Sequence, residues 1–158
     1  MKKSLVAYFS ASGITAQLAK RLAQAIGADT FEIIPQVLYT QADLDWTDKT
    51  SRSTLEMKDK TCRPPLAHPV PDVNRYEVIF VGFPVWWYRE PSIIDSFIEA
   101  CPWNGQTVVP FATSGGSGLG DAAKNIQALA PKAAVKEGKL WSRSAGSVEL
   151  ETWAKEFL

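Results

Sequence analysis

Three short segments of this chain carry residue types that can hold a phosphate or a flat ring. The first, residues 10–15, lies between an apolar, strand-like run and a run whose apolar residues recur at helical spacing. The N–H groups at a helix start are unpaired and carry partial positive charge, and Gly13 lets a ligand approach the backbone. Since the segment has no lysine or arginine, it predicts a monophosphate site built from neutral donors, at Ser10, Ser12, Gly13, Ile14 and Thr15.

Residues 10–15 match neither of the two common phosphate-binding motifs. A Walker-type loop needs Gly-x-x-x-x-Gly-Lys-Ser/Thr, and a dinucleotide fingerprint needs Gly-x-Gly-x-x-Gly. A purely structural interpretation is also open, in which Ser12 caps the helix and Thr15 has no role in its first turn. The segment alone does not choose between the two interpretations.

The second segment follows the strand-like run 76–83 and places three aromatic residues in a row. It comprises Pro84, Val85, Trp86, Trp87 and Tyr88. A surface loop gains nothing by exposing so much aromatic area, so we expect a stacking wall for a flat conjugated ring. The alternative is that one or two of these side chains turn inward and cover the edge of the core. Arg89 follows directly, where its charge would favour a negative charge on the ring.

The third segment follows the strand-like run 107–113 and is rich in glycine and serine. It comprises Thr113, Ser114, Gly115, Gly116 and Gly118. Backbone without bulky side chains can bring N–H and C=O groups edge-on to a polar heterocycle. A flexible connection that ends in a helix cap is the alternative. Together the three segments predict a site for a phosphorylated flat heterocycle.

The elements that must position these segments alternate between strand and helix. Apolar runs predict strands at 5–9, 30–34, 76–83, 107–113 and 133–141. A helix that ends at Gly27 follows the first strand, and the last helix, from about Ser147, is expected to turn Val148, Leu150, Trp153 and Phe157 inward. This alternation predicts an α/β fold, a doubly wound three-layer sandwich around a five-stranded parallel sheet. Ligands bind at the carboxyl ends of such strands, so the three segments should converge there.

Length and composition favour one domain with a small-molecule ligand. The 158 residues, 46% hydrophobic, suit a single domain over 1–158 with a polar insertion at about 36–71, which we expect to be partly helical. Thr40 and Asp43 resemble a capping pair within it. Seventeen basic and seventeen acidic residues give zero net charge, which provides no electrostatic case for nucleic acid.

Local features of the sequence predict where the protein is located and whether it inserts into a membrane. No apolar run approaches the roughly 20 residues that span a bilayer, so no membrane insertion is expected. The first apolar run ends at Ser10, too early for a secretion signal. Cys62 and Cys101 lack the spacing of a metal or redox site, which favours a cytoplasmic location.

The order of these elements, together with residues 10–15, 84–88 and 113–118, resembles the short-chain flavodoxin-like proteins over essentially the whole sequence. The resemblance implies the sheet order 2-1-3-4-5 and non-covalently bound FMN. Its phosphate would lie among Ser10, Ser12, Gly13 and Thr15, and its isoalloxazine ring between the other two segments. One position departs from the family, which commonly has Asn where this chain has Ile14.

The resemblance implies a redox protein, and three functions remain open at this point. An electron carrier would dock on a redox partner protein, whereas an FMN-dependent NAD(P)H:quinone-type reductase would act on a small quinone-like acceptor. Carriers of the family tend to be strongly acidic, so zero net charge and the long insertion favour the enzyme, while the resemblance itself favours the carrier. A flavin-free interaction scaffold is the third, and an exposed aromatic run would also suit a homodimer.

Overall fold

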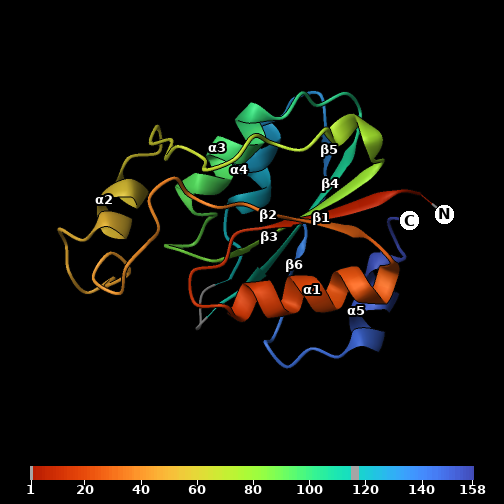
Figure 1. Ribbon diagram of the computed structural model, residues 1–158, viewed down its shortest axis with the longest axis horizontal. Helices are drawn as coiled ribbons and strands as arrows, with labels where there is room; N and C mark the ends of the chain where they lie inside the picture. The colour runs from red at the N-terminus through yellow and green to blue at the C-terminus, as the bar shows by residue number, and fades with distance from the viewer. Residues whose placement is uncertain (1, 115–117) are drawn as a thin grey trace.

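A parallel sheet between two layers of helices forms the centre of the molecule (Figure 1). The computed structural model describes residues 2–114 and 118–158. The strand order is β2-β1-β3-β4-β5, and a further short strand, β6, pairs with β4. The predicted α/β fold and the order 2-1-3-4-5 are therefore confirmed.

All strand pairs are parallel, so the carboxyl ends of the strands share one edge of the sheet. The strands are β1 (Ser4–Tyr8), β2 (Asp29–Glu32), β3 (Val78–Pro84), β4 (Thr107–Thr113), β5 (Ala134–Val135) and β6 (Lys139–Leu140). Pro84 at the end of β3 lies opposite Thr113 at the end of β4, and Tyr8 of β1 lies opposite Gly82. This register brings the segments that follow β1, β3 and β4 to the same edge.

Helices cover both faces of the sheet. They are α1 (Ile14–Ile26), α2 (Arg52–Lys58), α3 (Ser92–Ala100), α4 (Ala122–Leu129) and α5 (Ser147–Ala154), with a 3-10 turn at Val73–Arg75. Figure 1 shows α1 and α5 on one side and α3 and α4 on the other. Gly27 ends α1 in a left-handed conformation with φ 67°, as predicted. No helix in the described part of the chain is both long and apolar enough to cross a bilayer.

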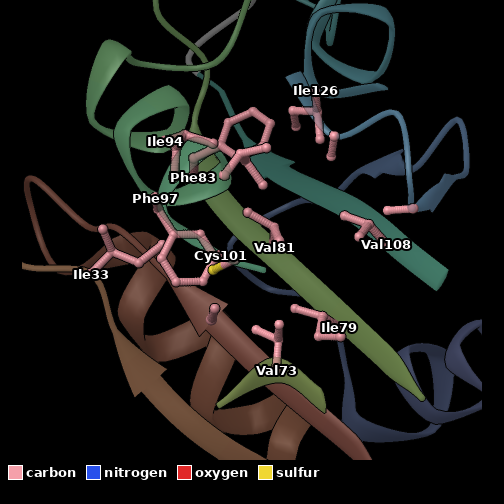
Figure 2. Close-up of a cluster of buried hydrophobic side chains, with 14 of the residues drawn as sticks. Ile33, Val73, Ile79, Val81, Phe83, Ile94, Phe97, Cys101, Val108 and Ile126 are labelled. Atoms are coloured by element: carbon pink, nitrogen blue, oxygen red, sulfur yellow. The ribbon is translucent and has the colours of Figure 1, made fainter. Parts of the chain in front are cut away.

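Alternate residues of β3 feed two separate cores. Val81 and Phe83 pack with Phe97 of α3 and Ile126 of α4 (Figure 2), whereas Phe80 packs on the other face with α1 and α5. The prediction for α5 holds for Leu150 and Trp153, which are buried, and for Phe157, which is partly buried against them. It was wrong for Val148, which is 77% exposed because it lies about half a turn away from the buried stripe of α5.

Pro110 divides the last predicted strand in two. β5 pairs with Thr107 and Val108, and β6 pairs with Phe111 and Ala112. Proline has no N–H to donate, so the neighbouring chain loses its ladder partner at that level. Gly138, with φ 80°, packs so closely on the Pro110 carbonyl that a Cβ atom would collide with it. The chain then pairs again as β6, and the residues after β6 reach the carboxyl edge.

The insertion, residues 36–71, projects beyond this edge and carries α2 (Figure 1). Its two ends meet beside β2, where the N–H of Gln36 donates to the carbonyl of Pro65 at 2.9 Å and that of Ala67 donates to the carbonyl of Ile34 at 2.8 Å. Thr40 and Asp43 form the predicted reciprocal bonds: each N–H donates to the other's side chain, at 2.9 and 3.1 Å. They close only a turn, since α2 begins at Arg52.

Candidate functional site

The three predicted segments meet at one groove of about 670 Å³ at the carboxyl edge of the sheet. A fourth segment, residues 140–143, completes its wall. The lining residues are Ser12, Ile14, Pro84, Val85, Trp86, Thr113, Ser114, Leu140, Trp141, Ser142 and Arg143. This volume lies within the usual range for sites that bury a small molecule.

The start of α1 is partly capped by its own loop. The Ser10 hydroxyl accepts the N–H groups of Gly13 and Ala16, both at 3.1 Å, so it belongs to the internal structure of the loop. Across residues 2–114 and 118–158, the N–H groups of Ile14 and Thr15 find no acceptor. The first turn of α1 also has no acidic residue. Two unpaired donors and the positive end of the helix dipole are therefore available to an anion.

Thr15 and Thr113 join the first and third segments. Their hydroxyl groups lie 2.8 Å apart and both residues are buried. Thr113 also lines the groove, whereas Thr15 is not among the lining residues. The hydrogen bond between them holds the first turn of α1 against the end of β4, which keeps the two walls of the groove in register.

Of the three consecutive aromatic residues 86–88, Trp86 is the one that lines the groove, and Trp141 lines it as well. Trp86 is half-buried, and its ring packs edge-on against Phe9 and Tyr39, with centroid distances of 5.6 and 5.4 Å. The Arg52 guanidinium lies 3.9 Å from the centre of the Tyr39 ring, and the Tyr39 hydroxyl donates to Glu56. Burial and this bond to Glu56 raise the pKa of Tyr39. The insertion thus supports Trp86 from behind.

Trp87 and Tyr88 face away from this groove. Residues 86–89 form a tight turn in which the N–H of Trp86 donates to the carbonyl of Arg89 at 3.1 Å and the reverse bond is 3.2 Å. Trp87 and Tyr88 have φ values of 49° and 62°, which cost bulky side chains about 1–2 kcal/mol each. They are 43% and 67% exposed and line a second groove, of about 220 Å³, with residues of α2 and α4.

Two features outside the turn hold it in this conformation. The carbonyl of Tyr88 accepts the N–H of Asp121 at 3.3 Å. Gly120, with φ 55°, lies directly on that carbonyl, where any Cβ would collide with it. The strain of two aromatic residues in left-handed backbone is therefore maintained by the start of α4, a pattern found more often at functional sites than elsewhere.

Arg89 is buried and does not reach the first groove, contrary to the expectation that it would influence a bound ring. Its guanidinium donates to the carbonyls of Glu90 and Met57 at 3.1 and 3.0 Å, and lies 3.6 Å from a carboxylate oxygen of Asp95. Burial, a hydrogen bond with Glu90 and repulsion by its charge raise the pKa of Asp95 to about 9. Asp95 therefore keeps a proton at neutral pH, where an ordinary carboxyl group is ionised.

Residues 140–143 were missed by the sequence analysis. A usable indication existed, because the last strand of a parallel sheet also ends at the ligand-binding edge, and a polar run from Ser142 to Ser144 follows it. Arg143 is the one cationic side chain among the described residues of the groove wall. The indole N–H of Trp141 is buried with no hydrogen-bond partner in the described structure.

The remaining predicted residues belong to the third segment. Ser114 lines it, and Gly118 is exposed with open space around it. Gly115 and Gly116 lie outside the described residues.

Comparisons with known proteins agree with this architecture. The sequence model of a family described as flavodoxin matches residues 3–157. A crystal structure of a candidate flavoprotein from Bacteroides uniformis has 44% sequence identity and a TM-score of 0.91, covering 98% of both chains. One from Bacteroides eggerthii has 43% identity and a TM-score of 0.92, covering 99% of this chain and 98% of its own.

A more distant structure carries a ligand. It is a flavoprotein from Lactobacillus acidophilus in complex with FMN, with 21% identity, a TM-score of 0.73, and coverage of 98% of this chain and 99% of its own. At this identity the likeness shows the fold alone. No curated protein matches the chain.

Proposed function

Since the chain belongs to the flavodoxin family, we propose that it binds FMN non-covalently in the first groove and transfers electrons through it. The observation that carries this proposal is the meeting of two unlike surfaces in one groove. The open N–H groups at the start of α1 suit a phosphate, and half-buried Trp86 contributes aromatic surface that suits a flat ring.

The donors of the groove fit such a ligand along its length. Ile14 and Thr15 offer backbone N–H groups at one end, and Thr113 and Ser114 form part of the wall. Two of these donors, the N–H groups of Ile14 and Thr15, have no acceptor in the described part of the chain. A ligand rich in oxygen acceptors would therefore complement this groove.

FMN would supply the hydride and single-electron chemistry, as cofactors of this kind do. The chain's own contribution is to bind the phosphate, to orient the ring against Trp86 and to keep water from its buried face. Apart from Arg143, no acidic, basic or histidine side chain stands among the described lining residues. The groove thus provides binding and orientation without a general acid at the ring.

Titration of the apo-protein with FMN tests the proposal. We expect saturable, stoichiometric binding that moves the visible flavin spectrum, and reversible reduction and reoxidation of the bound flavin by small redox dyes. A protein that binds neither FMN nor riboflavin would contradict the proposal and support the scaffold interpretation.

A second candidate function, an FMN-dependent reductase of quinone-like acceptors, is favoured by the second groove. The turn 86–89 separates the two grooves, and Trp87 and Tyr88 line the second beside Lys58 and Lys60. An acceptor held there would lie close to the ring-binding wall. Steady oxidation of NAD(P)H with a quinone and no other protein would support the reductase, whereas turnover only with an added protein reductase would support the carrier.

A further inference from the structure

We propose that Arg143 binds the phosphate of FMN and makes the groove select FMN over riboflavin, with Arg21 as the residue that positions it. This inference rests on the proposed FMN site and adds a residue that lies far from residues 10–15 in the sequence. Among the described lining residues, Arg143 is an unpaired cation beside a phosphate cradle that is otherwise neutral.

Charge is the first argument. Ser12 and Ile14 at the start of α1 offer only neutral groups, whereas a phosphate monoester carries up to two negative charges. Arg143 lines the same groove as both residues. Its planar guanidinium can donate two parallel hydrogen bonds to phosphate oxygens, which a helix dipole cannot replace.

Availability is the second argument. Arg21, Arg52, Arg63 and Arg89 each bond protein carbonyl or carboxylate groups. By contrast, no hydrogen bond or ion pair engages the Arg143 guanidinium anywhere in the described structure. The residue is exposed at the groove wall, so its donors are free to meet an anionic ligand.

The backbone on both sides of Arg143 is held in place. The N–H of Trp141 donates to the carbonyl of Ala112 in β4 at 2.8 Å. The Arg21 guanidinium donates to the carbonyls of Arg143 and Ala145 at 3.3 and 2.6 Å.

A local bridge adds to this support. The hydroxyl of Ser142 accepts the N–H of Ser144 at 3.2 Å and lies 2.9 Å from the Ser144 hydroxyl, so the two serines close a turn around Arg143. Because Arg21 belongs to α1, the same helix that presents the open N–H groups also fixes the backbone that carries Arg143.

The test compares two ligands that differ only in the phosphate. Apo-protein with Arg143→Ala, Arg143→Lys or no substitution is titrated calorimetrically with FMN and with riboflavin. Loss of a charged hydrogen-bonding partner should weaken FMN binding by about 10- to 100-fold and leave riboflavin binding unchanged. The FMN affinity of Arg143→Lys should lie between those of the wild-type protein and Arg143→Ala. The FMN affinity of Arg143→Ala should also depend less on salt concentration than that of the wild-type protein. Arg75→Ala is the matched control, because it removes an exposed arginine just before β3, at the opposite edge of the sheet.

Each outcome decides a different claim. If wild-type protein binds FMN and Arg143→Ala binds it equally well, or loses FMN and riboflavin to the same degree, the inference on Arg143 fails and the FMN site stands. If the wild-type protein binds neither flavin, both proposals fail.

Arg21 is tested by selectivity as well as by stability. Arg21→Met should reduce the ratio of FMN to riboflavin affinity by several-fold, less than Arg143→Ala does, and Arg21→Lys should restore part of it. A variant that melts at a lower temperature but keeps the wild-type ratio would show that Arg21 has a structural role alone.

Discussion

The two grooves on either side of the turn 86–89 are built from consecutive residues but differ in character. The first holds Trp86 half-buried, with neutral donors and one arginine around it. The second holds Trp87 and Tyr88 beside Lys58, Lys60 and Arg89, and the Arg89 guanidinium lies 3.6 Å from the buried carboxyl group of Asp95. One tight turn with two positive φ values makes this division, which shows that neighbours in an aromatic run need not serve the same ligand.

The strongest way to disrupt this division is to move the turn itself. Gly120→Ala places a Cβ against the Tyr88 carbonyl at a φ of 55°, so it should destabilise the protein by about 2–4 kcal/mol and weaken flavin binding. Urea unfolding measures the loss. Gly118→Ala is the matched control, because open space surrounds that glycine, and it should change stability by less than about 0.5 kcal/mol. Equal effects of the two substitutions would show that the turn does not depend on Gly120.

Substituting the two tryptophans one at a time tests which groove holds the ring. Trp86→Ala should weaken FMN binding by about 1–3 kcal/mol, the usual value of stacking on an aromatic side chain. Trp87→Ala should change it by less than about 0.5 kcal/mol, since its side chain lines the other groove. Calorimetric titration measures both. The reverse order of effects would place the ring in the second groove.

The contrast between the grooves also marks what could be predicted from sequence. Strand runs and helical stripes determine the sheet, because burial on both faces requires continuous apolar residues such as those of β3. The convergence of three segments followed from the parallel topology alone. The directions of the Trp87 and Tyr88 side chains could not be predicted in this way. They depend on positive φ angles that are maintained by Gly120, thirty-two residues after Tyr88.

Residues 140–143 show a second limit of the same kind. Their position depends on Pro110 and Gly138, which together divide the last strand into β5 and β6. Ser10 is a third case: its hydroxyl, predicted to surround a phosphate, also accepts two N–H groups of the adjoining loop and helix start, a role that its residue type did not reveal. In each case the residue type was informative, while the direction of the side chain was decided by contacts that the type does not reveal, distant in sequence for residues 86–88 and 140–143 and local for Ser10.

The buried carboxyl pair beneath the second groove predicts a pH dependence of stability. Asp95 has a pKa raised to about 9, so it binds a proton in the folded protein that the unfolded chain releases near its ordinary pKa of about 4. Between these values the folded state holds more protons, and stability falls as pH rises, by at most about 1.4 kcal/mol per pH unit from this group. Glu90, Arg89 and Arg63 are the charged groups that face it.

Urea unfolding between about pH 6 and pH 8 measures this slope. Asp95→Asn keeps a neutral hydrogen-bond donor beside Glu90, so its stability should vary less with pH than that of the wild-type protein. Glu99→Gln removes an exposed carboxyl from the same helix and should keep the wild-type slope. An unchanged slope in Asp95→Asn would mean that the pKa of Asp95 is not raised in the folded protein.

The smallest expected effect concerns the strain in the turn. Tyr88 is 67% exposed and has a φ of 62°, a conformation that asparagine tolerates better than tyrosine. Tyr88→Asn should therefore stabilise the protein by about 0.5–1 kcal/mol, while Trp46→Asn, at another exposed aromatic residue without positive φ, should give no gain. If the second groove holds an acceptor, the more stable Tyr88→Asn variant should also show a higher KM for quinones at unchanged FMN affinity. Greater stability with no change in quinone kinetics would mean that the strained aromatic pair serves neither folding nor acceptor binding.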